Sequence, residues 1–343
     1  ITPRPDAGSG LIEDEASGAS RLALSYGDVE TTTISGTTAT VAGLTQGGDE
    51  VTVDLDSGEV TVNGNTTDLS GFSSVILDLL GGNDAVTVLN QTGGAFALTI
   101  NGGEPGTGSD SVTFQSGGDT EVDVAAEEVT EGGNTVSLSD VEVLTVEGSD
   151  DDTNPDAFEV TGYGTASDLE TLILDGADTD ATDDGDTIDV ELSATPDALT
   201  VSPTGTDSAL LDVGAGPQIQ ITNVDGQAGE VTIDDAGGVD SVTLAGTGGT
   251  DALGATVSGT NTLVTLGSLL PVDLNDGNIE GLAFDAGLGD DTLTVSALVP
   301  MAITYGGGDG TDDLDVSAGS ADVTYTPGPT NDAGRLSYDT GAM

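Results

Sequence analysis

The chain has 343 residues, of which 35% are hydrophobic and only 3% aromatic, so its core must be filled mainly by Val, Leu and Ile. Its 62 acidic residues are accompanied by three arginines, no Lys and no His, and the formal net charge is −59 at pH 7. Because phosphate binding depends on Lys and Arg, this balance excludes nucleic acid and anionic membrane surfaces as partners and favours divalent cations.

The missing residue types also argue against an enzyme. Without His, Lys or Cys, the chain has no ordinary general base near neutral pH, no Schiff-base amine and no thiolate. A pair of carboxylates could still hydrolyse glycosides, but five Tyr and five Phe are few for stacking sugars. We therefore predict no catalytic residue and no organic cofactor. No apolar stretch approaches the ~18 residues of a membrane span, so we expect no membrane insertion.

Residues 1–20 contain two prolines, several small residues and little periodicity, which predicts an extended N-terminal arm. Since the sequence starts at Ile1 and not at Met, we expect a processed product or an excerpt of a longer chain. From about residue 21 onward, short runs such as Val51-Thr52-Val53 and Val86-Thr87-Val88 alternate apolar residues with Thr. Clusters of Gly, Asn and Asp separate these runs, so we predict many short strands joined by turns.

One phrase, Asp-x-apolar-x-apolar, recurs after turns rich in Gly or Asp. Its eight copies begin at Asp49, Asp84, Asp110, Asp156, Asp186, Asp240, Asp291 and Asp312. A second phrase, apolar-Glu-x-Leu, contains Glu142, Glu170 and Glu280. The repeat predicts an all-β, elongated parallel β-solenoid, similar to a β-helix or β-roll, over residues 21–343. Tandem β-sandwich domains remain the alternative, because they also have short strands at regular intervals.

The spacing of the copies indicates how the coils are built. Asp291 and Asp312 are 21 residues apart, which suits one turn of such a solenoid. The interval from Asp186 to Asp240 is longer, and we expect it to hold two coils or one coil with an insertion.

The clearest motif lies in the last coils. Residues 307–315, Gly-Gly-Asp-Gly-Thr-Asp-Asp-Leu-Asp, match the repeat GGxGxDxUx at every fixed position, and residues 286–294 depart from it only at the first glycine. This pattern resembles the RTX family of calcium-binding β-rolls, and more closely the looser repeats of large secreted bacterial surface proteins and adhesins. The resemblance implies Ca²⁺ held by carboxylates and by glycine carbonyls of neighbouring turns.

We predict metal ligands in these two turns and in the more degenerate copies, namely Asp290, Asp291, Asp309, Asp312, Asp313, Asp84, Asp110, Asp186 and Asp240. The acidic clusters 150–152 and 178–186 are either further sites or solvated loops. At every such turn, an alternative is that the aspartate only caps backbone N–H groups or faces water.

The two ends of the chain share a short pattern. Arg21-Leu22-Ala23-Leu24-Ser25-Tyr26 is similar to Arg335-Leu336-Ser337-Tyr338. The segments 21–46 and 319–343 are either ordinary edge strands or strands that mediate assembly, because uncapped solenoid ends can pair with another chain. We expect head-to-tail self-association through Arg21, Tyr26, Arg335 and Tyr338.

These features together predict a secreted, calcium-stabilised structural protein of the cell surface, a subunit of a fibre, sheath or surface layer. The alternative is a calcium-dependent adhesin or stalk segment that binds carbohydrate, ice or another cell. A flat, Thr-rich outer surface would favour this second function.

Overall fold

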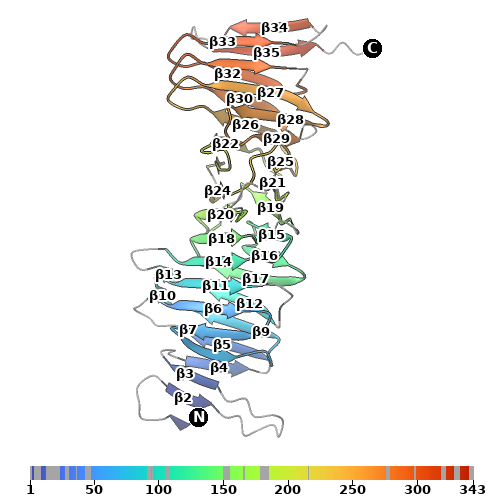
Figure 1. Ribbon diagram of the computed structural model, residues 1–343. Coiled ribbons are helices and arrows are strands. Elements are labelled where there is room, and N and C mark those ends of the chain that lie inside the picture. The colour runs from blue at the N-terminus through green and yellow to red at the C-terminus, as the bar shows by residue number, and fades with distance from the viewer. Residues whose placement is uncertain are drawn as a thin grey trace. The chain divides into compact units, whose positions relative to one another are not determined.

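The computed structural model describes residues 2–3, 9–12, 24–27, 31–35, 37–42, 48–90, 94, 96–105, 109–149, 155–164, 167–177, 185–214, 216–275, 279–296, 299–317, 322–327 and 333–339. The chain divides into two compact units (Figure 1). Unit 1 comprises Ile1–Ser149 and Ser167–Ile173, and unit 2 comprises Asp150–Ala166 and Leu174–Met343. All regular structure in the described residues is β, so none of them forms a helix long and apolar enough to cross a membrane.

Unit 1 contains eighteen of the strands: β1 (Thr2–Pro3), β2 (Ser9–Ile12), β3 (Leu24–Gly27), β4 (Thr31–Ser35), β5 (Thr38–Ala42), β6 (Glu50–Asp54), β7 (Glu59–Val62), β8 (Asn65–Asp68), β9 (Ser74–Asp78), β10 (Gly81–Gly82), β11 (Ala85–Leu89), β12 (Ala97–Asn101), β13 (Glu104–Pro105), β14 (Ser111–Gln115), β15 (Thr120–Asp123), β16 (Glu128–Glu131), β17 (Asn134–Ser139) and β18 (Val143–Glu147).

Strand β20 (Thr171–Asp175) includes the boundary between the units. Unit 2 contains the remaining strands: β19 (Ala157–Tyr163), β21 (Thr187–Leu192), β22 (Ala198–Pro203), β23 (Ala209–Asp212), β24 (Gln218–Thr222), β25 (Val231–Asp235), β26 (Asp240–Ala245), β27 (Ala252–Ser258), β28 (Asn261–Leu266), β29 (Val272–Asn275), β30 (Ile279–Asp285), β31 (Thr292–Val295), β32 (Ala302–Gly306), β33 (Asp313–Val316), β34 (Asp322–Pro327) and β35 (Ala333–Asp339).

Each unit is a parallel β-solenoid in which the chain passes alternately through two sheets. In unit 1 the first sheet has the order β8-β7-β6-β11-β14-β18 and the second β4-β5-β9-β12-β17-β16-β15. In unit 2 the corresponding orders are β24-β23-β22-β26-β30-β32-β35-β34 and β19-β21-β25-β29-β28-β27-β31-β33. Strands from successive coils pair in parallel, as β6, β11 and β14 do. The predicted all-β solenoid is confirmed, and the sandwich alternative, which needs antiparallel sheets, is wrong.

In the described residues, four antiparallel meanders interrupt the coils: β6–β8, β15–β17, β22–β24 and β27–β29. Each meander adds two strands to one sheet before the chain crosses to the other sheet. The long interval between Asp186 and Asp240 contains the meander β22–β24 and also β25, so it combines an insertion with more than one coil. Irregular spacing of the repeat therefore reflects extra strands within coils.

The core of each coil is built by simple alternation of inward and outward side chains. In unit 1, Val53, Val88, Phe114 and Val146 occupy the same register position in four neighbouring strands and are fully buried. Rows of this kind, built mostly of Val, pack side chain against side chain from strand to strand, so the core is filled with few aromatic residues. Each coil buries these residues only against the coils on either side of it. The coils therefore depend on one another for stability and fold cooperatively.

The largest buried side chain in unit 2 provides a test of this core. Tyr163 at the end of β19 is fully buried, and its hydroxyl donates a hydrogen bond of 2.8 Å to the carbonyl of Leu211 in β23. We expect Tyr163→Phe to lower the free energy of unfolding by about 1–2 kcal/mol, because the buried carbonyl loses its donor. Urea denaturation followed by circular dichroism would measure the change. An unchanged midpoint would show that another group satisfies the carbonyl.

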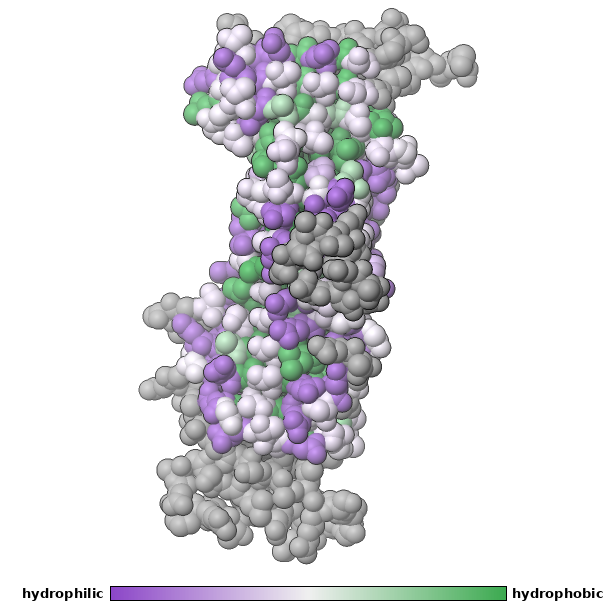
Figure 2. Space-filling model, in the orientation of Figure 1, coloured by the Kyte–Doolittle hydropathy of each residue, from purple (hydrophilic) through white to green (hydrophobic). Residues whose placement is uncertain are grey.

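Outward positions carry mainly Thr and other polar residues. One row in the first sheet of unit 1 consists of six threonines in register: Thr66, Thr61, Thr52, Thr87, Thr113 and Thr145. We call this row the threonine file. Figure 2 shows hydrophilic and near-neutral residues over much of the visible surface, with hydrophobic ones scattered between them. Among the described residues, only Val239 and Leu288 are large hydrophobic residues with strong exposure.

The terminal segments form antiparallel structures. Within residues 1–20, β1 and β2 form a three-stranded antiparallel sheet with β3, which contains Tyr26. Arg21 lies outside the described residues. At the other end, β34 and β35 form a hairpin, and β35 pairs antiparallel with β32, with Arg335 opposite Thr304. Tyr338 is opposite Val323 in β34. The hairpin thus reverses strand direction at the last coil.

Candidate metal site along the carboxylate ladders

In unit 1, acidic side chains join successive coils at the corner where strands of the first sheet begin. Asp84 Oδ1 accepts a hydrogen bond of 2.6 Å from the backbone N–H of Asp49, and Asp110 Oδ1 accepts one of 2.8 Å from Asp84. The series continues with Glu142, whose Oε2 accepts from the N–H of Asp110 at 2.6 Å. Each acid therefore binds the backbone of the coil before it. We call such a series a carboxylate ladder.

Unit 2 has the same arrangement at the corners of both of its sheets. In the first sheet, Asp240 accepts from the N–H of Asp197, and Glu280 accepts from Asp240 at 2.7 Å. In the second sheet the corresponding pairs, acceptor first, are Asp186 with Asp156 at 2.7 Å, Asp291 with Asp251 at 2.8 Å and Asp312 with Asp291 at 3.0 Å.

The two repeated phrases of the sequence thus occupy one structural position. Glu142 and Glu280 take the place of the aspartate, and Glu280 does so at an irregularity in the pairing of β26 with β30. Two ladder members were missed from the sequence, Asp197 and Asp251. Asp197 starts Asp-Ala-Leu-Thr-Val, a further copy of the first phrase, and could have been found. Asp251 starts Asp-Ala-Leu-Gly-Ala, a weaker copy in which the second apolar position carries only Ala255.

The second carboxylate oxygen of five ladder aspartates is buried and has no hydrogen-bond partner: Asp84, Asp110, Asp240, Asp291 and Asp312. Burial raises the pKa of Asp84 to about 6, against the N–H of Asp49, which lowers it. Burial also raises the pKa of Asp110, with the nearby charge of Glu142 adding to the effect. A buried carboxylate oxygen without a partner is costly, so it calls for a proton or a cation.

Turn glycines, which have no Cβ, pack closely against some of these oxygens. A Cβ added to Gly238 would stand 2.7 Å from Asp240 Oδ2 and 3.1 Å from the carbonyl oxygen of Thr195. At Gly102, the corresponding point lies 2.8 Å from Asp110 Oδ2 and also against the carbonyl oxygen of Asp140. We call each of these places a glycine notch. At a notch, a carboxylate oxygen and a carbonyl oxygen lie beside the same glycine, and these are the oxygen types that a hard cation prefers.

The two best motif turns stack as the sequence predicted. Residues 287–290 and 308–311 lie in successive coils, with a parallel bridge between Leu288 and Asp309. Asp290 Oδ1 accepts a 2.9 Å hydrogen bond from the N–H of Thr311, and Asp290 itself is exposed. Asp291 and Asp312 belong to the ladder, whereas Asp309 and Asp313 are exposed.

The predicted ligands therefore fall into two groups. Asp84, Asp110, Asp186, Asp240, Asp291 and Asp312 line the inner corners, and Asp290, Asp309 and Asp313 lie on the outer surface of the turns. In the part of the chain that the structure describes, no three acidic side chains gather into a metal site by themselves. A cation there would need backbone carbonyls as well. Residues 150–154 and 178–184, with most of the two acidic clusters, lie outside the described residues.

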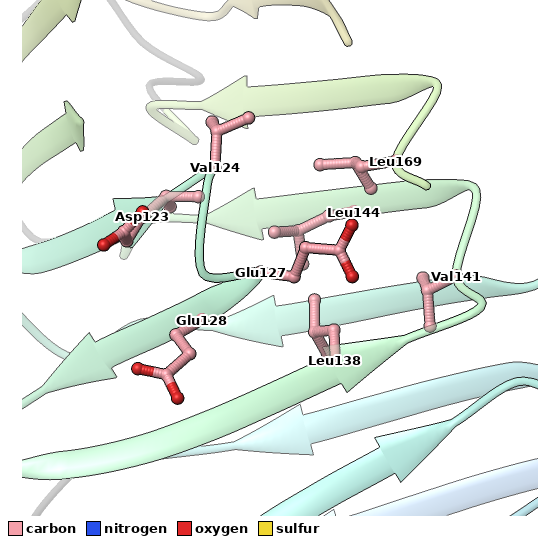
Figure 3. A pocket seen from close by; sticks show the side chains of 9 residues that line it. Asp123, Val124, Glu127, Glu128, Leu138, Val141, Leu144 and Leu169 are labelled. Carbon is pink, nitrogen blue, oxygen red and sulfur yellow. The ribbon is translucent and has the colours of Figure 1, made fainter. Parts of the chain in front are cut away.

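A small pocket in unit 1 lies beside the meander β15–β17 (Figure 3). Its walls are mainly Val and Leu side chains. Glu127 reaches toward Leu144 in this view, and its Oε1 accepts a 2.6 Å hydrogen bond from the N–H of Asp168. That carboxylate thus joins two segments of unit 1.

Compared with protein-family models, with curated proteins and with solved structures, the chain shows no significant match to any of them. The resemblance to RTX repeats therefore depends on the turn motifs alone.

Proposed function

We propose that the protein is an extracellular structural subunit whose coils are stabilised by Ca²⁺ bound along the carboxylate ladders. The observation that carries this proposal is the pairing of buried, unpartnered carboxylate oxygens with glycine notches at Asp110 and Asp240. These oxygens are hard ligands, which Ca²⁺ prefers, and the formal charge of −59 supplies a strong attraction for cations. Bound Ca²⁺ would supply positive charge where each ladder has none.

The extracellular location and the assembly into a fibre, sheath or surface layer belong to the same proposal. Weak calcium sites fill at the millimolar calcium concentrations found outside cells. A solenoid also ends in strands with open edges, and these favour head-to-tail addition of another copy. The outermost strands of unit 2, β33 and β34, are such edges. Negative-stain electron microscopy in calcium should show filaments, and uniformly monomeric particles would contradict the assembly.

The calcium part is tested best by two substitutions of one ladder residue. In Asp110→Asn the amide oxygen can still accept from the N–H of Asp84, while the unpartnered oxygen becomes an NH₂ group that repels cations. We expect this variant to be as stable as the wild type in chelator and to lose about 2–3 kcal/mol of the stabilisation that saturating Ca²⁺ provides.

Asp110→Ala is the matched control, because it removes the acceptor as well as the charge. It should cost about 2 kcal/mol in chelator, since the buried N–H of Asp84 loses its partner. Thermal unfolding with Ca²⁺, with chelator and with NaCl of matched ionic strength would separate these effects. If Ca²⁺ stabilises Asp110→Asn as much as the wild type, no ion binds at this notch.

The threonine file favours a second function, an adhesin or stalk that binds an ordered surface such as carbohydrate or ice. Six hydroxyls in register, spaced by the strand separation of about 4.8 Å, form a regular polar row. Co-sedimentation with insoluble polysaccharide and an ice-affinity assay would test it. Binding by wild-type protein that is lost in Thr87→Val and Thr113→Val would favour the adhesin over the filament subunit.

A further inference from the structure

Two buried carboxyl groups flank a single turn of unit 2. Asp235 ends β25 and Asp240 begins β26, and residues 236–239 connect them. Asp240 is 1% exposed and Asp235 is 7% exposed. The two acids lie at the two ends of one corner, so their proximity does not depend on stacking of repeated turns.

The hydrogen bonds of the two carboxyl groups leave at least one oxygen, Asp240 Oδ2, without a donor. Asp235 Oδ1 accepts a 2.8 Å hydrogen bond from the N–H of Gly237, and Asp240 Oδ1 accepts from the N–H of Asp197. Asp240 Oδ2 is buried and has no partner. Burial raises the pKa of Asp240 to about 6, against the N–H of Asp197 that lowers it, and a side-chain interaction with Asp235 adds to the rise.

The surroundings provide more oxygen but no compensating charge. The carbonyl of Thr195 lies at the same glycine notch as Asp240 Oδ2. Asp197 Oδ2 is occupied by the backbone N–H and hydroxyl of Ser193, at 3.1 and 2.7 Å. Glu280 accepts from the N–H of Asp240. The sequence of unit 2 contains one cationic residue, Arg335 in β35, which is three strands away from β26 in the sheet, so two close carboxylates are left to repel each other at neutral pH.

We propose that the turn between Asp235 and Asp240 binds one divalent hard cation through both carboxylates and the carbonyl oxygen of Thr195. Asp235 lies outside every repeated motif, and it adds a second carboxylate to the glycine notch of Asp240, which the notch at Asp110 does not have. The inference rests on the proposed function in that it assigns Ca²⁺ as the ion. The second carboxylate makes this site the tightest of those considered, since affinity for Ca²⁺ rises with ligand charge.

The test is calorimetric titration of Ca²⁺ into metal-free full-length protein at pH 7.5, at constant ionic strength. We expect Asp235→Asn to bind one ion fewer than the wild type, or to bind that ion at least tenfold more weakly. Asp285→Asn is the control, because it removes the same charge from an exposed residue at the end of β30 and should bind as the wild type does. Circular dichroism would verify that each variant is folded.

A second variant shows whether Asp235 and Asp240 bind the same ion or affect Ca²⁺ binding separately. Asp240→Asn should remove the same ion, and the double variant Asp235→Asn with Asp240→Asn should lose no more ions than either single variant. If Asp235→Asn binds Ca²⁺ like the wild type while Asp110→Asn loses an ion, the two-carboxylate site is wrong and the calcium-stabilised subunit stands. If the wild type binds no Ca²⁺ at all, both proposals fail.

Discussion

Gly289→Ala is expected to unfold the last coils of unit 2 or to cost at least about 4 kcal/mol, because the new Cβ has no space and an unfavourable backbone angle. It would stand 2.5 Å from the carbonyl oxygen of Gly249 and 2.8 Å from the N of Thr250, both backbone atoms of the preceding turn. The residue also has φ of +132°, which L-residues rarely adopt.

Gly248→Ala is the matched control in the adjacent turn. A Cβ there would meet nothing within 4 Å, and its φ is not in the left-handed region. We expect a change in unfolding free energy of less than about 0.5 kcal/mol. Hydrogen exchange of β31 and β33 would follow the last coils, and chemical denaturation the whole chain. Equal stability of the two variants would mean that these turns do not stack as described.

Acidification in the presence of chelator is expected to stabilise the protein, which is unusual for a chain with so many carboxylates. Asp84 and Asp240 have folded pKa values of about 6, above the ordinary 3.8. The folded state therefore binds protons more tightly, and the free energy of unfolding falls as pH rises from about 4 to about 6. Each carboxyl contributes on the order of 2 kcal/mol to this change.

Two observations limit the pH window and identify the cause. Hydrogen bonds from Ser57 and Ser70 lower the pKa values of Asp54 and Asp68, so protonation of these acids removes stability only below pH 4. Saturating Ca²⁺ should flatten the dependence between pH 4 and 7, because the ion replaces the proton. Melting temperatures in chelator that rise steadily from pH 4 to pH 7 would contradict the raised pKa values.

Most of the fold could be predicted from local patterns. All eight aspartates of the repeated phrase precede or begin a strand, and the apolar residues after them are buried almost everywhere, as at Leu293 and Val295. Alternation with a period of two depends only on neighbours in the sequence, so it is readable from the chain. The meanders were not predicted, because strands such as β16 and β23 alternate in the same way whether they pair parallel or antiparallel.

The candidate site was predicted less completely. Sequence identified most of the ladder acids, but it could not show that Asp110 binds the N–H of Asp84, 26 residues away. It also gave no reason to select Asp235, which belongs to no motif and approaches Asp240 only because one turn brings them together. Hydrogen-bond partners between coils depend on which residues of successive coils lie side by side. The meanders change the number of residues per coil, so the sequence separation of such partners varies along the chain.

The placement of the meanders has a mechanical consequence. Among the residues that the structure describes, each unit carries one meander in each of its two sheets, β6–β8 and β15–β17 in unit 1, and β22–β24 and β27–β29 in unit 2. Two added strands widen a sheet by roughly 10 Å. Deleting one meander would shorten a single wall and turn its unit into a wedge that bends toward the deletion, whereas deleting both would shorten the unit and keep it straight.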